Sequence, residues 1–223
     1  MDNLRQLKAD FYKYPEIYNS VTFINFVLFT IFCLSSTGTK SESVWWEEEW
    51  GLSYDTTVQK YHNYIMDTLK PWTWLCHSFM MNNFLSMSYA MILVHCLGHP
   101  IAATIGSKNL WQYVLLTSVF SGILMQAGQF GYYSLYHHNK ISPTEKQFGP
   151  WDVCTALFLM NYYLYHVNPI SFLLSFNGWL KYACLVGQLC ICYFDWQPTV
   201  AGLGVGYLLC QFHPALRVKN FIK

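Results

Sequence analysis

Residues 198–206 read PTVAGLGVG and open the last apolar segment of the chain, which runs from about Thr199 to Phe212. Gly202 and Gly206 form a G-x-x-x-G pair within it, with Gly204 between them. Residues four apart lie on one face of a helix, and glycines on that face let a neighbouring backbone come close, as in helix contacts within lipid. We therefore expect Gly202 and Gly206 to pack against another membrane helix.

Five further apolar segments precede this one, at about 20–35, 72–97, 110–128, 150–167 and 179–194. A membrane helix needs about 20 mainly apolar residues, and fewer where protein neighbours cover its ends. The composition agrees with a membrane protein, because 53% of the 223 residues are hydrophobic and only 11% are charged, against about 25% charged residues in soluble domains. The expected fold class is an all-α membrane protein with six transmembrane helices.

The six segments divide the chain into an N-terminal segment (1–19), a membrane domain (20–213) and a C-terminal tail (214–223). The first 19 residues lack the apolar core of a signal peptide, so we expect the targeting information to be internal. An even number of spans places both termini on one side. More of the 13 Lys and Arg residues fall on that side, so the positive-inside rule favours termini in the cytosol or the mitochondrial matrix.

The longest loop, 36–71, contains Trp45, Trp46 and Trp50 beside the run Glu47–Glu49. Tryptophan favours the headgroup level of a membrane. We expect the three tryptophans to anchor this loop at the membrane interface, with the acids in water. A binding site is the alternative interpretation.

Several function classes are excluded by the polar residues. The 13 basic residues are scattered and balanced by 12 acids, which argues against nucleic acid as a partner. The eight cysteines form no C-x-x-C pair and lie in apolar runs, so we interpret them as small buried hydrophobes. The chain has no G-x-x-x-x-G-K-[ST] or H-E-x-x-H motif. We expect neither a metal nor a cofactor.

Two polar features leave an alternative open. Asp152 lies at the expected start of the fourth segment, where we expect it to cap the helix, although an acid at membrane depth is often functional. His95, His166 and His213 fall near expected helix ends on one side, which permits a haem but is also where amphipathic rings rest. His77 and His95, on one expected helix, would lie about 27 Å apart and could not share a haem.

Glycines mark three junctions along the chain. Leu97–Gly98 and Ile105–Gly106 lie between the second and third segments, Gly149 precedes the fourth, and TVAGLGVG opens the last. In this order they resemble the rhomboid superfamily, whose motifs are an L-G-x(6)-L-G junction, G-x-S-G before helix four and H-x-A-G-L-x-x-G in the last helix. The resemblance covers about 72–212 and implies a rhomboid-like six-helix bundle with a long, partly embedded first loop.

The same resemblance implies that the catalytic groups are missing. Rhomboid proteases use a serine nucleophile, a histidine base and an H-x-x-x-N oxyanion pair. Aligned on Gly149, the nucleophile position holds Trp151, and aligned on 201–203 the base position holds Thr199. The oxyanion positions fall on Ser86 and Ala90. An indole is only a donor, and a threonine hydroxyl takes up no proton near neutral pH. We therefore expect no enzymatic activity.

An inactive rhomboid-like frame is expected to serve as an accessory subunit of a large membrane complex, in contact with other membrane subunits and lipids. A respiratory assembly of the mitochondrial inner membrane is the expected location. The alternative is a Derlin-like factor that binds membrane proteins in the endoplasmic reticulum. The short tail after Phe212, HPALRVKNFIK, counts against it, because Derlins carry a long cytosolic tail.

Overall fold

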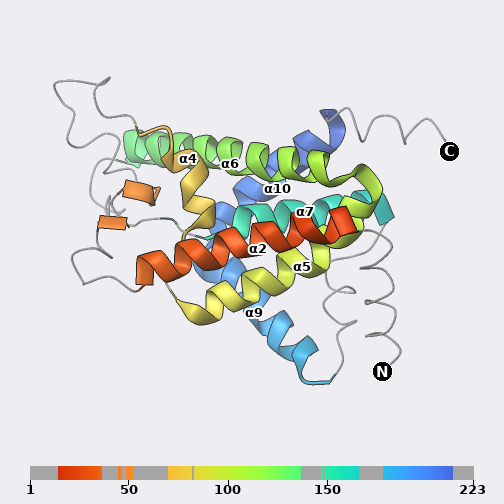
Figure 1. The fold of residues 1–223 in the computed structure, drawn as a ribbon. Coiled ribbons are helices and arrows are strands. Elements are labelled where there is room, and N and C mark those ends of the chain that lie inside the picture. Colours follow the sequence, from red (N-terminus) through yellow and green to blue (C-terminus); the bar gives the residue numbers. More distant parts are fainter. Residues whose placement is uncertain are drawn as a thin grey trace.

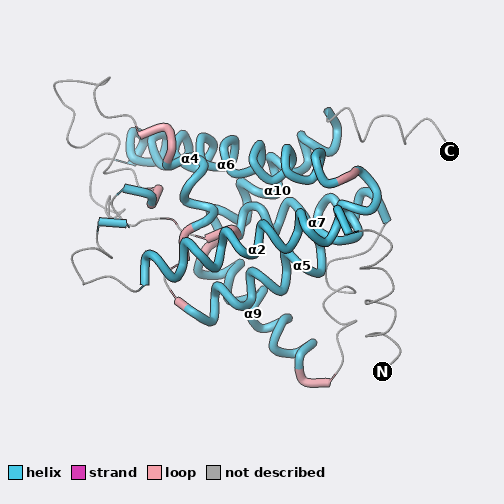
Figure 2. Tube along the Cα trace, viewed as in Figure 1, coloured by secondary structure: helices cyan, strands magenta, loops and turns pink. Residues whose placement is uncertain are grey.

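The computed structural model describes residues 15–36, 45–46, 49–52, 70–81, 83–136, 147, 149–165 and 178–212. Within these ranges the chain is all-helical apart from turns and one isolated antiparallel bridge between Leu52 and Gln147. The elements, shown in Figures 1 and 2, are α2 (Pro15–Ser36), α4 (Thr73–Cys76), the 3-10 helix η2 (His77–Phe79), α5 (Phe84–Ile105), α6 (Ser107–Tyr136), α7 (Trp151–Tyr165), α9 (Leu180–Phe194) and α10 (Trp196–Phe212). The all-α class is confirmed.

Within the described ranges, two helices are long and apolar enough to cross a bilayer. They are α5 and, in α6, the stretch Ser107–Gln129, while Ser20–Ser36 in α2 forms a shorter apolar helix. Helices α7, α9 and α10 have 15, 15 and 17 residues, below the roughly 20 that a full span takes. By length and composition, two of the six expected spans are complete.

The expected second span, 72–97, is wrong because the chain breaks in its middle. The short helices α4 and η2 end at Phe79, and Met80 and Asn83 then adopt extended backbone conformations before α5 begins at Phe84. The Asn83 side chain accepts a hydrogen bond of 2.7 Å from the Ser86 N–H and so caps α5. His77 and His95 consequently lie on different elements, and His95 lies in the middle of α5 rather than near its end.

The expected loop at 98–109 is also wrong. Helix α5 continues to Ile105 through Gly98 and Pro100, and only Gly106, with φ of 87°, separates it from α6. Proline removes one helical hydrogen bond, but α5 packs closely on α2, where a Cβ at Gly98 would lie 3.3 Å from Val21 Cγ2. Tertiary packing therefore overrides the local breaking signals. With its 30 residues, α6 extends about 45 Å.

Helix α7 is the central helix of the bundle (Figure 1). Every residue from Trp151 to Phe158 is buried, because α7 is surrounded by α5, α6 and α10. A helix that is buried on all sides has no solvated face, so its polar residues need partners inside the protein. Two of these, Asn161 and Thr155, bond backbone carbonyls: Asn161 Nδ2 donates to Leu97 O at 3.1 Å, and Thr155 Oγ1 to Trp151 O at 2.6 Å.

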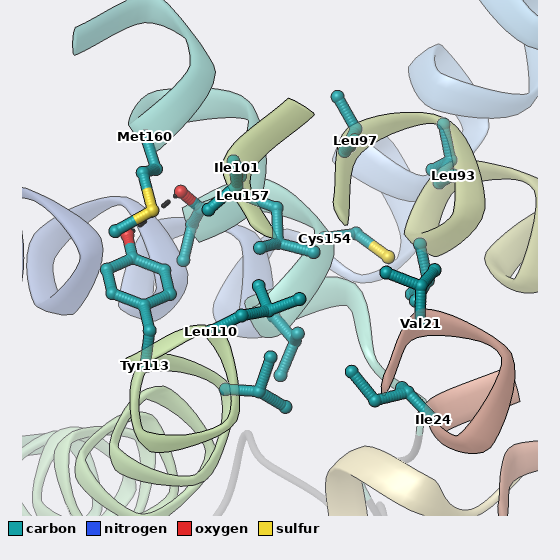
Figure 3. Packing of buried hydrophobic residues seen from close by; sticks show 14 of the residues in the cluster. Val21, Ile24, Leu93, Leu97, Ile101, Leu110, Tyr113, Cys154, Leu157 and Met160 are labelled. Carbon is teal, nitrogen blue, oxygen red and sulfur yellow. Dashed lines mark hydrogen bonds between the residues drawn. The ribbon is translucent and has the colours of Figure 1, made fainter. Parts of the chain in front are cut away.

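Tyr113 of α6 joins three helices in the core, and Figure 3 shows its ring among the surrounding buried side chains. Its side chain is fully buried. Its hydroxyl donates to Ala156 O of α7 at 3.0 Å and lies 3.5 Å from Gly206 O of α10. The phenol thus satisfies its only donor at the place where α7 and α10 come together.

The glycines of the last helix bring α10 against α7. A Cβ at Gly202 would lie 2.3 Å from Asp152 O and 2.7 Å from its Cα, and a Cβ at Gly206 would lie 3.0 Å from Ala156 Cα. Gly204 faces away from α7, and its Cβ would meet only Leu124 Cδ2, at 3.8 Å. The close contact therefore depends on two of the three glycines.

Gly202→Ala is expected to destabilise the protein by about 3 kcal/mol, the upper end of overpacking costs, because backbone rather than a movable side chain opposes the new methyl group. Gly204→Ala is the matched control, and it is expected to be neutral or to stabilise by about 0.5–1 kcal/mol through helix propensity. Thermal unfolding of the purified protein in detergent measures both. Equal effects of the two substitutions would contradict this close contact.

Candidate functional site

The residues at the four positions of the catalytic motif come from three helices, and three of these residues surround the start of α7. Trp151 is the first residue of α7 and is 5% exposed. Ala90 of α5 is fully buried in one apolar cluster with Trp151 and Ile191 of α9. Ser86, one turn before Ala90, lines a groove together with Trp151. Segments far apart in the sequence therefore bring these three positions to one place.

Thr199, the fourth position, lies in the first turn of α10 and is 9% exposed. Its hydroxyl donates to the Asp195 carbonyl at 3.0 Å, so its proton is engaged by the backbone of its own turn. Gly202, three residues further along α10, contacts the backbone of Asp152. The start of α10 thus packs beside the start of α7.

A groove of about 360 Å³ opens between α5 and α9, with Trp151 on its wall. The Trp151 and Tyr89 rings lie 6.3 Å apart, at an angle of 37°, and Tyr89 donates to Gln188 Oε1 of α9 at 3.3 Å. The lining is mainly apolar and consists of Leu85, Ser86, Ser88, Tyr89, Ile92, Trp151, Ala183, Gly187, Cys190 and Ile191. None of these ten residues is a histidine, an aspartate or a glutamate, the side chains that most often act as general bases.

Next to Trp151, the carboxylate of Asp152 is completely buried and bonds residues of two other elements. The Ser78 hydroxyl lies 3.1 and 2.9 Å from its two oxygens, and the Ser121 hydroxyl of α6 donates to Oδ2. His77 Nε2 lies 3.4 Å from Oδ2. Asp152 lies in the first turn of α7, as the interpretation as a helix cap expects, and its carboxylate also joins α7 to η2 and α6, which that interpretation did not include.

The hydrogen bonds of His77 decide where its proton lies. Its Nδ1 is 3.0 Å from the Thr73 carbonyl, and a carbonyl only accepts, so Nδ1 carries a hydrogen. Its Nε2 faces the Ser78 hydroxyl at 3.2 Å and the Asp152 carboxyl. The imidazole and the hydroxyls of Ser78 and Ser121 are thus the polar partners of this carboxyl among the described residues. A buried acid of this kind is tolerated only with such a partner.

Serine, histidine and aspartate together are also the groups of a hydrolase, but their arrangement here is structural. Ser78, His77 and Asp152 are each fully buried, and none lines the groove. The imidazole donates its Nδ1 hydrogen to a backbone carbonyl, whereas a catalytic triad directs it to the carboxylate. This buried cluster, Ser78–His77–Asp152–Ser121, therefore joins η2, α6 and α7.

Sequence reasoning missed His77, Ser78 and Ser121 as partners of Asp152. The signal available was the acid itself, because an ionisable group inside an apolar segment calls for a named partner. Ser78 and Ser121 lie 74 and 31 residues away in the chain, and no local spacing connects them.

The expected anchor of the first loop is described only in part, at 45–46 and 49–52. The Trp46 ring lies 5.3 Å from that of Trp45 and 4.8 Å from that of Trp50. Glu49, expected in water, pairs with Lys70 at 2.7 Å, and its carbonyl accepts from Trp72 Nε1 at 2.9 Å. The three rings form one aromatic cluster, and their place at a membrane interface stays a prediction.

Of the three histidines in the haem alternative, the structure describes only His95. His95 contacts His99, one turn on in α5, with ring centroids 4.6 Å apart, while His166 and His213 lie outside the described residues. Within the described ranges, no three His, Cys, Asp or Glu side chains gather as metal ligands.

No protein-family model matches the chain, and no curated protein matches it either.

Asp152→Ala is expected to cost about 3–5 kcal/mol of stability, because it leaves the buried side chains of His77, Ser78 and Ser121 without their shared partner. In a double-mutant cycle with His77→Ala, the two effects are expected to be non-additive by about 1–3 kcal/mol. Thermal unfolding in detergent supplies the four stabilities. As a control, Asp152→Ala combined with Ser88→Ala of the groove is expected to be additive. An additive His77–Asp152 pair would show that the two side chains do not interact.

Proposed function

We propose that this chain is a catalytically inactive, rhomboid-like membrane protein with six transmembrane helices, and that it acts as an accessory subunit of a larger membrane complex. The observation that carries the proposal is Trp151. It stands at the motif position of the nucleophile, at the start of the central helix, two residues after Gly149 with its φ of 99°. There the indole closes the inner wall of the groove.

The rhomboid-like frame is supported by the way the motif positions come together. The alignment used only sequence spacing, yet Trp151, Ser86 and Ala90 adjoin one another around the groove and its wall, and α10 meets α7 through the glycines of the last motif. The short helices α7, α9 and α10 then cross the bilayer as parts of a bundle, in which neighbouring helices cover their ends.

Loss of activity follows from what these side chains can do. Trp151 has no nucleophilic atom, Ala90 has no donor beyond its backbone, and the Thr199 hydroxyl bonds its own helix. Among the described residues of the groove lining, Ser86 holds a motif position and carries a hydroxyl, and none of them is a histidine, an aspartate or a glutamate. Serine chemistry needs both groups within hydrogen-bond reach.

The role as a subunit is supported by the outer surface. Large apolar side chains are exposed on several helices, among them Phe84 at 62%, Trp179 at 76% and Tyr193 at 77%. Such a surface needs lipid or other membrane proteins to cover it. The proposed partners are membrane subunits and lipids, and the proposed location is the mitochondrial inner membrane.

Native gel electrophoresis of gently solubilised source membranes, with mass spectrometry of the band, tests the subunit role. The chain is expected to migrate in one large band, in a constant ratio to the same partners. Migration as a small species, or with varied partners in low amounts, would contradict the subunit role and favour a Derlin-like factor of the endoplasmic reticulum.

A fluorophosphonate probe tests the missing chemistry. The purified chain is expected to remain unlabelled under conditions that label an active rhomboid protease, because the described lining of the groove places no histidine or carboxylate beside its serines. Labelling that disappears in Ser86→Ala would contradict the proposal and make Ser86 a nucleophile.

A further inference from the structure

We propose that an internal water molecule binds at the hydroxyls of Thr117 and Ser118 in α6 and links them to the buried carboxylate of Asp152. Both side chains are fully buried, and neither hydroxyl has a hydrogen-bond partner within the described part of the chain. A buried hydroxyl without a partner costs stability, and such groups in native proteins usually bond ordered water. The inference is independent of the proposed function, because it concerns the interior of the bundle and requires no partner subunit.

Other threonines in the helices of this protein show what a helical hydroxyl usually bonds. Thr104, Thr155 and Thr199 each donate to the carbonyl four residues earlier, at 2.9, 2.6 and 3.0 Å. Thr117 has the Tyr113 carbonyl in the same relation, yet its hydroxyl makes no such bond. Threonine in a helix has two accessible rotamers, and the bond to the preceding turn favours one of them. The Thr117 hydroxyl is therefore turned from its own backbone and left for another partner.

The position of the two hydroxyls on α6 brings them to the Asp152 cluster. Ser121, whose hydroxyl bonds the Asp152 carboxylate, follows Ser118 by three residues and Thr117 by four. Residues at these spacings are neighbours on one face of a helix. The carbonyl of Ser118 also accepts from Ser121 Oγ, at 3.1 Å. Tyr113, one turn before Thr117, bonds α7 as well, so Thr117 lies between two points at which α6 is bonded to α7.

The Asp152 cluster itself has fewer hydrogens to donate than acceptor positions to fill. Ser78 Oγ faces both oxygens of the carboxylate, at 3.1 and 2.9 Å. Ser121 Oγ faces the carboxylate and the Ser118 carbonyl. Each hydroxyl has a single hydrogen, whereas a carboxylate can accept about four hydrogen bonds. A water molecule donates two hydrogens and accepts from other groups, so it would supply the cluster and the two hydroxyls of α6 at once.

Water fits this position better than a metal cation. The carboxylate of Asp152 already has His77 Nε2 at 3.4 Å, so a cation would have to compete with the imidazole. Within the described ranges, no three His, Cys, Asp or Glu side chains gather as metal ligands. Buried water, by contrast, typically makes about three hydrogen bonds to groups that are otherwise unsatisfied. The hydroxyls of Thr117 and Ser118 and the carboxylate are three such groups.

The sign of a change in thermal stability tests the inference, measured on the full chain in detergent. Thr117→Val and Ser118→Ala each remove one hydroxyl. Each is expected to lower Tm by about 2–4 °C, the shift that corresponds to one hydrogen bond in a chain of this size. If the hydroxyls had no partner, their removal would raise Tm, because an unsatisfied buried group would be lost. A raised or unchanged Tm in both variants therefore overturns the inference.

Thr155→Val is the matched control, because Thr155 is also buried but its hydroxyl bonds its own helix. It is expected to leave Tm nearly unchanged. A loss of stability in Thr155→Val as large as that in Thr117→Val would overturn the inference, because any buried threonine would then give the same result.

A crystal structure of the full chain identifies the ligand directly. Density is expected within about 2.5–3.0 Å of Ser118 Oγ, the usual O–H···O distance, and is expected to be absent from Ser118→Ala. No density at this position overturns the inference. The ionic composition of the buffer separates water from a cation. Tm is expected to be equal in sodium chloride and in choline chloride at one ionic strength, and a higher Tm in sodium chloride would replace the water by a sodium ion.

Discussion

The start of α7 is the point on which the rest of the structure depends, and Asp152 is its centre. The backbone of Asp152 faces Gly202 so closely that a methyl group would lie 2.3 Å from its carbonyl oxygen. The carboxylate of the same residue bonds Ser78 and Ser121 and pairs with His77. One buried residue therefore holds α10 by its backbone and η2 and α6 by its side chain. Buried networks of this kind favour a single arrangement, because every alternative leaves a polar group unpaired.

The neighbouring side chains of Trp151 and Asp152 point to different surroundings at the start of α7. The indole faces the open groove with Tyr89, while the carboxylate faces the closed interior. Where rhomboid proteases are expected to present a nucleophile to the groove, this chain presents a large apolar ring, and its polar groups are bonded inside. This arrangement is the basis on which we propose a rhomboid-like frame without catalytic activity.

The sequence predicted those parts of the fold that depend on apolar length. The expected 150–167, 179–194 and 199–212 agree closely with α7, α9 and α10. The sequence-based prediction was wrong where a local hydrogen bond or a contact with a distant residue determined where a helix begins or ends. Asn83 starts a new helix within an apolar run by capping it, and packing on Val21 carries α5 through Gly98 and Pro100. The residues of the Asp152 cluster lie far apart in the sequence, and no regular spacing connects them. The acid within an apolar segment was therefore the one sign of the cluster in the sequence. The motif register, by contrast, singled out Trp151, Ser86 and Ala90, which lie near one another in the structure; their assignment as rhomboid motif positions stays a prediction.

The central claim is that these helices form one six-span bundle, and the sidedness of its turns tests it most directly. A membrane-impermeant maleimide, applied to single cysteines in a cysteine-free background, reports the side of each position. Lys108→Cys and Trp179→Cys are expected to label from the side of the termini, and Asn83→Cys and Trp196→Cys from the opposite side, because α5, α6, α9 and α10 alternate in direction. Labelling of all four positions from one side would contradict the six-span account.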